Sequence, residues 1–115
     1  MEPINALERT RDPDGVWRRR VNGVIGGAYA HLFDRFDALI FLEAIDFDVV
    51  GAWRGEQEAA LRGIRLDELH APDHARLSEF IAHFERLSRH MIAGGVRPAT
   101  WIKLDRNRQP LQWPR

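Results

Sequence analysis

The residues best suited to chemistry lie near the middle of the chain, where Trp53-Arg54 is followed by Gln57-Glu58. A guanidinium such as that of Arg54 stays charged at physiological pH and binds oxyanions through paired hydrogen bonds. Arg54, Glu58 and Arg62 recur every four residues, so on a helix they would share one face and could form ion pairs. Two interpretations stay open, an oxyanion site and a solvated helix face, and these residues taken alone favour the solvated face.

Histidines form a second candidate group. His83, Arg86 and His90 would share one helix face at spacings of three and four residues, beside an apolar stripe. Such a face could line a pocket for a polar or anionic substrate. We favour a solvated face with a titratable histidine. The group is also a poor metal site, because the arginine cation would repel a metal ion.

The residues predict no metal site. The chain contains no cysteine, which excludes disulfides and thiolate-bound metals. His70 and His74 have the four-residue spacing of a helical metal pair. Pro72 lies between them and disfavours the helix that would align them, and no neighbouring motif completes a coordination shell.

Charge and hydropathy also limit the partners. Arg18-Arg19-Arg20 could contact nucleic acid, but the chain holds 17 Lys+Arg and 17 Asp+Glu, and no aromatic platforms accompany the run. We interpret the run as a solvated helix face and predict no nucleic-acid partner. No apolar run approaches the roughly 18–20 residues of a membrane span, so we predict no membrane partner. The lack of a signal-peptide core and of cysteine predicts a cytoplasmic protein.

The N-terminal third predicts an arm followed by a helix. Residues 1–11 show no clear period and indicate an arm, and Asp12-Pro13 is typical of a helix start. Apolar residues then recur at helical spacing to about residue 33. Gly23, Gly26 and Gly27 weaken this helix, since each costs about 1 kcal/mol relative to alanine, so we expect a kink or a close backbone contact there.

The rest of the chain predicts two strands joined by helices. Residues 38–42 are apolar without alternation, which is typical of a strand covered on both faces, and residues 99–105 form the second strand. Residues 47–62 predict a helix capped by Asp46, and residues 75–93 predict a helix that ends at Gly94-Gly95. Residues 63–74 indicate a mobile connector and residues 106–115 a tail. Strands joined by a helical crossover should be parallel.

The predicted sheet is too small to satisfy its own strands. At 115 residues the chain holds at most one small domain. Two parallel strands cannot cover the apolar segment 38–42 on both faces and both edges. We therefore predict that the chain forms a homo-oligomer or binds a different polypeptide that supplies the missing neighbours.

Several motifs, spread from about residue 5 to residue 111, together resemble one enzyme family. They are Asn5-Ala6-Leu7-Glu8, Asp12-Pro13-Asp14-Gly15-Val16-Trp17-Arg18, Tyr29-Ala30-His31-Leu32-Phe33, Trp53-Arg54-x-x-Gln57-Glu58 and Phe80-Ile81-x-His83-Phe84-Glu85-Arg86-Leu87-Ser88-Arg89-His90-Met91. The chain is similar to the C-terminal part of bacterial glycerate-kinase-like P-loop kinases, relatives of uridine kinase, pantothenate kinase and phosphoribulokinase. The resemblance implies an α/β fold, a partial three-layer P-loop NTPase-like unit over residues 12–105, with two parallel strands and three main helices.

The resemblance also implies an activity and a set of site residues. Kinases of this type transfer a phosphoryl group from ATP, with Mg²⁺, to a hydroxyl of a small metabolite such as glycerate. The resemblance places Arg54 and Arg62 on a lid that approaches the phosphates, and Asp105, Arg106 and Arg108 in a loop that borders the adenine. For that loop, a polar turn ending an edge strand is an equal alternative. No acceptor-binding residue is implied.

The chain departs from this family in the phosphate-binding loop. The kinases carry a G-x-x-x-x-G-K-[ST] loop, whereas Gly23-Val24-Ile25-Gly26-Gly27 lacks the Lys and Ser/Thr that would hold the phosphates and Mg²⁺. The acidic segment that organises Mg²⁺ is also missing. We therefore expect no catalysis and little ATP binding by this chain alone, and a complementary half carrying the Walker loop as partner. The alternative is a non-catalytic kinase remnant that serves as an oligomerising or protein-interaction module.

Overall fold

The computed structural model describes residues 1–111 and divides the chain into two compact units, Met1–Leu39 and Ile40–Arg115, called unit 1 and unit 2 below. The α/β unit expected over residues 12–105 is thus divided after Leu39. The last part of the expected tail, residues 112–115, lies outside the described residues. The fold mixes helices with two parallel strands, as the sequence predicts.

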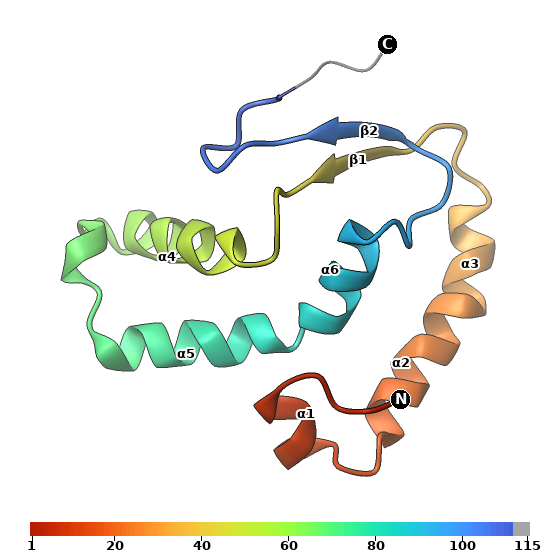
Figure 1. Ribbon diagram of the computed structural model, residues 1–115, viewed down its shortest axis with the longest axis horizontal. Helices are drawn as coiled ribbons and strands as arrows, with labels where there is room; N and C mark the ends of the chain where they lie inside the picture. Colours follow the sequence, from red (N-terminus) through yellow and green to blue (C-terminus); the bar gives the residue numbers. More distant parts are fainter. Residues whose placement is uncertain (112–115) are drawn as a thin grey trace. The chain divides into compact units, whose positions relative to one another are not determined.

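Unit 1 consists of three helices, α1 Ala6–Arg11, α2 Val16–Gly26 and α3 Ala28–Phe33 (Figure 1). The segment expected to be an arm therefore contains α1, whose first turn is capped by Asn5 through a 2.9 Å bond from the Glu8 N–H. Six residues carry too few apolar positions to reveal a helical period. The expected kink is confirmed at Gly27, where a Cβ atom would lie 2.9 Å from the Gly23 carbonyl oxygen.

The prediction of a solvated face at Arg18-Arg19-Arg20 is wrong for Arg18, which is buried. Its guanidinium lies 3.5 Å from Asp12 and 4.0 Å from Glu8, and it donates to the Asp12 and Met1 carbonyl oxygens. Asp12 in turn accepts from the backbone N–H groups of Trp17 and Arg18. Burial acts to raise the pKa of Asp12, but these N–H bonds and the Arg18 charge outweigh it and lower the pKa. Arg18 therefore joins the start of α2 to the segment before it.

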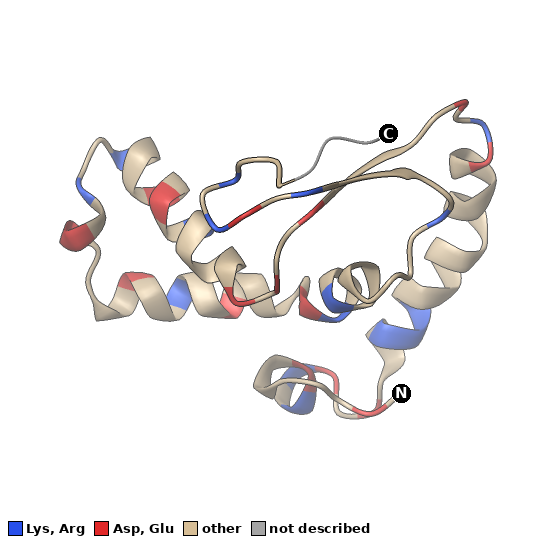
Figure 2. Ribbon diagram, turned by 45° about the horizontal axis from the view of Figure 1, so that its top comes forward, with Lys and Arg blue, Asp and Glu red and all other residues tan. Residues whose placement is uncertain are grey.

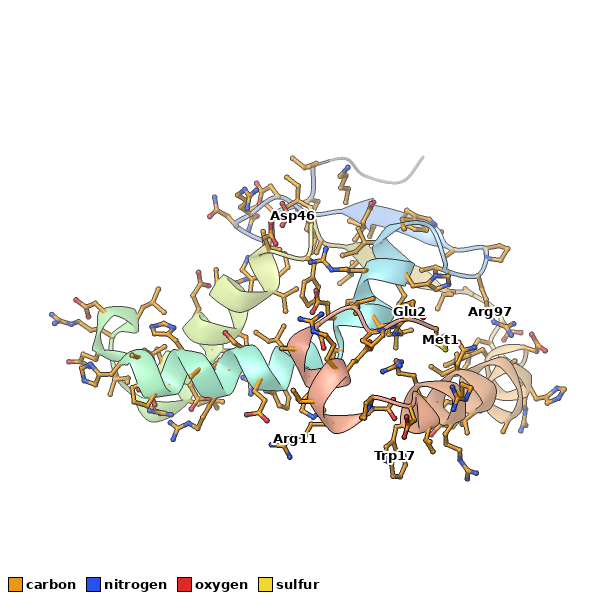
Figure 3. The ribbon with its side chains drawn as sticks, turned by 60° about the horizontal axis from the view of Figure 1, so that its bottom comes forward. Met1, Glu2, Arg11, Trp17, Asp46 and Arg97 are labelled. Carbon is orange, nitrogen blue, oxygen red and sulfur yellow. The ribbon has the colours of Figure 1, made fainter. Side chains whose placement is uncertain are left out.

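Unit 2 begins with β1 Ile40–Glu43 and ends its regular structure with β2 Thr100–Lys103 (Figure 1). Between the strands lie α4 Val49–Arg62, the short 3₁₀ turn η1 Leu66–Glu68, α5 Ala71–Ala82 and α6 Glu85–Ile92. The strands pair in parallel, with Ile40 opposite Thr100 and Glu43 opposite Lys103, which confirms the prediction. The Asp46 carboxylate accepts from the Val49 N–H at 3.1 Å, so it caps the start of α4 as expected (Figure 3). The N-cap position itself is occupied by Asp48, whose side chain makes no capping bond.

The connector expected over residues 63–74 already includes the start of α5, so the prediction that Pro72 disfavours a helix there was wrong. Pro72 occupies the first turn of α5, where a missing N–H has no intrahelical partner to lose. The Asp73 carboxylate accepts from the His70 N–H at 3.0 Å and closes the helix start. His70 and His74 consequently lie one turn apart.

The long helix expected over residues 75–93 is divided between α5 and α6. His83 Nδ1 lies 2.9 Å from the Glu79 carbonyl oxygen, which the His83 backbone N–H would otherwise use. That N–H bonds instead to Phe80, and the Phe84 N–H bonds to Ile81. Each of these bonds spans three residues, so the helix tightens and turns at this point.

Most of the buried residues of unit 2 belong to helix α4. Val49 and Ala59 of α4 and Leu69, which follows η1, are the buried hydrophobic residues among those described. The side chains of Leu66 and Leu69 pack over Gly55, and an added Cβ there would lie in ordinary contact with them at 3.6 and 3.9 Å. The sheet is covered less well, and the β1 residues Ile40 and Leu42 remain 62% and 59% exposed.

Candidate functional site

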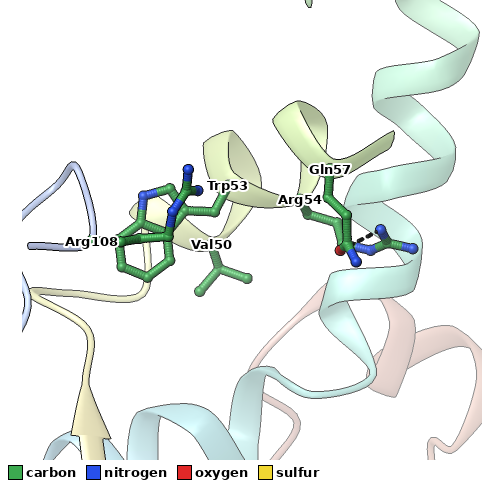
Figure 4. A pocket seen from close by; sticks show the side chains of 5 residues that line it. All are labelled: Val50, Trp53, Arg54, Gln57 and Arg108. Atoms are coloured by element: carbon green, nitrogen blue, oxygen red, sulfur yellow. Dashed lines mark hydrogen bonds between the residues drawn. The ribbon is translucent and has the colours of Figure 1, made fainter. Parts of the chain in front are cut away.

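A pocket of about 350 Å³ lies on unit 2, between the first half of α4 and the turn that follows β2 (Figure 4). Its lining residues are Val50, Trp53, Arg54, Gln57 and Arg108. The α4 members occupy positions i, i+3, i+4 and i+7, which lie on one face of a helix. Arg108 reaches the same pocket from the other end of the sequence.

The turn after β2 is built by its own backbone and by Asp105. Asp105 Oδ1 accepts from the N–H groups of Asn107 at 2.8 Å and Gln109 at 2.9 Å. Leu104 and Pro110 form an antiparallel bridge across the turn. Arg108 adopts a left-handed conformation with φ of 61°, which closes the turn. The polar turn expected as one alternative is therefore present, while a role beside the adenine stays a prediction.

Three contacts hold this turn against α4. The Trp53 indole N–H donates to the Arg106 carbonyl oxygen at 2.7 Å. The Arg106 guanidinium pairs with Asp46 at 3.0 Å, and the Arg108 guanidinium pairs with Glu56 at 2.8 Å. Figure 4 shows Arg108 beside the Trp53 ring, and its guanidinium carbon lies 5.6 Å from the ring centroid. The turn and α4 thus form one site.

Arg54 differs from Arg108 in having no carboxylate partner among the described residues. It donates to the neutral Gln57 side chain at 2.7 Å and lies 5.2 Å from the Phe80 ring centroid. Within residues 1–111 it forms no ion pair, so the pair expected with Glu58 is replaced by the bond to Gln57. Acidic and basic residues are interspersed along the helices of unit 2 (Figure 2).

Arg62, the other arginine expected at the phosphates, lies elsewhere on α4. It pairs with Glu58 at 2.8 Å and with Asp73 of α5 at 3.1 Å. The hydrogen bonds that the Arg62 guanidinium donates to Asp73 and Glu58 raise the pKa of Arg62. Eight residues of helix place its Cα about 12 Å from that of Arg54 along the axis. The structure therefore places Arg54 and Arg108 on the lining of one pocket, while Arg106 contributes only its carbonyl oxygen to Trp53 and Arg62 lies outside the lining.

The histidine candidates do not contribute to the pocket. His83 is bound to its own helix, as described above. The ring of His90 packs against Gly95, where an added Cβ would lie 2.1 Å from His90 Nε2. Within residues 1–111 no group of three or more metal-ligating side chains gathers.

The sequence did not single out Glu56 or Phe80 as parts of the site. Glu56 lies in the unassigned part of the Trp53-Arg54-x-x-Gln57-Glu58 motif, and Phe80 belongs to the stripe expected in the core. No spacing rule could have paired them with arginines, because one contact joins α4 to the turn after β2 and the other joins α4 to α5.

Comparisons of the chain with protein-family models, curated proteins and solved structures gave no match. The fold and the site define the class directly: a mixed helix and strand chain with a parallel strand pair, carrying a cationic, aromatic pocket at the end of β2. Over residues 1–111 no helix has the length and apolar character needed to cross a lipid bilayer.

Proposed function

We propose that this chain is the C-terminal part of an ATP-dependent small-metabolite kinase of glycerate-kinase type, and that the pocket of unit 2 contacts the phosphates of the nucleotide. The observation that carries this proposal is the Arg54 guanidinium, which lines the same pocket as Trp53 and Arg108 and bonds to a neutral side chain rather than to a carboxylate. The resemblance of the Trp53-Arg54-x-x-Gln57-Glu58 motif to such kinases supports the same assignment.

In this proposal each part of the pocket has a chemical role. Arg54 binds phosphate oxygens, for which a planar guanidinium is well suited. The turn at residues 105–108 approaches the adenine, and the bond from the Trp53 indole N–H to the Arg106 carbonyl oxygen fixes its position relative to α4. Phosphoryl transfer depends on positioning the triphosphate and Mg²⁺, which in these kinases is largely the work of the glycine loop. Residues 1–115 contain no such loop, so we expect a Kd on the order of millimolar for ATP.

Replacement of Arg54 tests this proposal directly. We expect Arg54→Gln to weaken ATP binding by about fivefold or more, because one charge-assisted contact is lost. Arg62→Gln is the matched control, since it removes an identical charge from the same helix outside the pocket, and should change the Kd less than about twofold. Ligand-observed NMR titration with Mg·ATP measures all three Kd values. Equal affinities of the Arg54→Gln and unmodified chains would overturn the proposal.

The exposed apolar residues of β1 favour a second candidate function, that of an oligomerising or protein-interaction module. Ile40 and Leu42 lie side by side on one face of the two-stranded sheet. Strands of a parallel sheet are normally covered on both faces, so this face is suited to association with another polypeptide. The test belongs to the whole molecule and is described in the Discussion.

A further inference from the structure

The two arginines of the pocket differ in their partners. Arg108 is paired at 2.8 Å with the Glu56 carboxylate, whereas Arg54 contacts a neutral amide and an aromatic ring. Glu56 does not line the pocket itself. It lies two residues after Arg54 on α4, so the two side chains leave the helix in different directions, and within residues 1–111 the Glu56 carboxylate pairs with Arg108 alone. The pocket therefore offers a ligand two guanidinium groups: that of Arg54, which has no carboxylate partner among the described residues, and that of Arg108, which is already paired with Glu56.

The Glu56–Arg108 pair can open without disturbing the fold. The two side chains are 46% and 49% exposed, and ion pairs at such exposure contribute little to stability. The backbone of Arg108 is held independently, since its N–H donates to the Asp105 carbonyl oxygen at 3.0 Å. Exchange of one anion for another at Arg108 thus requires only side-chain movement.

We propose that Glu56 is an internal counter-anion that competes with phosphate-bearing ligands for Arg108. This inference rests on the proposed function of the pocket. A ligand with a single phosphate group binds Arg54 and leaves the Glu56–Arg108 pair closed. A ligand with two or more phosphate groups reaches Arg108 by displacing Glu56. Glu56 thereby limits the affinity of the pocket for polyphosphates more than for monophosphates.

The test compares Glu56→Gln with Glu58→Gln, using inorganic phosphate and pyrophosphate as probes. The two substitutions remove the same charge from the same helix, but Glu58 is paired with Arg62 outside the pocket. We expect Glu56→Gln to tighten pyrophosphate binding about three- to tenfold and phosphate binding less than about twofold. Glu58→Gln should change either affinity less than about twofold. Adding Arg108→Gln to Glu56→Gln should remove the pyrophosphate gain, because Glu56 acts through Arg108.

The outcomes separate this inference from the proposed function. If Glu56→Gln and the unmodified chain bind pyrophosphate equally, the counter-anion role is wrong while the pocket remains an anion site. A gain that persists in the Glu56→Gln, Arg108→Gln double variant, or that equals the gain from Glu58→Gln, also overturns the role of the pair. If no variant binds either probe, the proposed function fails and the inference fails with it.

Discussion

Arg54 and Arg62 show how the same side chain on the same helix meets two different environments. Arg62 forms ion pairs with Glu58 and with Asp73 of α5, and so joins two helices. Arg54 contacts an amide and a phenylalanine ring and has no carboxylate partner among the described residues. Spacing along the sequence predicted the Arg62–Glu58 pair correctly, because that pair lies within one helix. It could not predict Asp73 or Phe80, which reach α4 from another helix.

The first prediction concerns Asp73, whose carboxylate joins α5 to α4 through Arg62. The His70 N–H bond and the contacts with Arg62 and Arg76 together hold the pKa of Asp73 below its ordinary value. The carboxylate therefore stabilises the fold above about pH 4 and loses this contribution as the pH falls through its lowered pKa. We expect Asp73→Asn to lower the urea midpoint at neutral pH and to leave it nearly unchanged near pH 2. A difference that is equal at both pH values would contradict this role.

Among the elements, α4 was predicted closely and the helices after it were not. Its cap at Asp46 and its last residue, Arg62, follow from local signals in the sequence. The break between α5 and α6 depends on a side chain of His83 taking a backbone acceptor, which an apolar stripe does not reveal. The turn at residues 105–108 was recognisable as polar, but its attachment to Trp53 and Glu56 depends on tertiary contacts.

The end of α4 gives the second prediction. Gly63 follows the helix in the left-handed conformation with φ of 67°, and no atom would obstruct an added Cβ there. Gly63→Ala should therefore destabilise unit 2 by about 1 kcal/mol through backbone strain alone. Gly51→Ala in the first turn of α4 is the control, because it is equally open and should be neutral or stabilising by up to about 1 kcal/mol. Chemical unfolding followed by circular dichroism distinguishes them, and equal effects would refute the argument.

For the whole molecule, the sequence predicted a parallel strand pair that requires neighbours, and the structure shows the exposed face that such neighbours would cover. The sequence did not predict the division after Leu39, because the helical and strand patterns follow one another without a recognisable linker between them. Large apolar side chains also remain exposed in unit 1. Trp17, one of the apolar residues at helical spacing, is 69% exposed and points away from α2 (Figure 3).

Association is the third prediction. We expect the chain to self-associate at micromolar concentration, with Leu42→Lys on β1 weakening the association by tenfold or more, since it places a charge on the apolar face. Leu61→Lys is the control, because Leu61 of α4 is 74% exposed and stands apart from the sheet. Sedimentation velocity over a concentration series measures both. A monomer at all concentrations, or equal effects of the two substitutions, would exclude the sheet face as the interface.

The most direct test of the central claim is the indole resonance of Trp53, because this residue both lines the pocket and binds the turn after β2. In a two-dimensional NMR titration of the full chain with ATP, we predict that the Trp53 indole N–H signal shifts with a Kd on the order of millimolar. The signals of Trp17 and Trp101, which do not line the pocket, should stay in place. A Trp53 signal unchanged at saturating ATP, or an equal shift of the Trp17, Trp53 and Trp101 signals, would contradict the assignment of this pocket as the anion site.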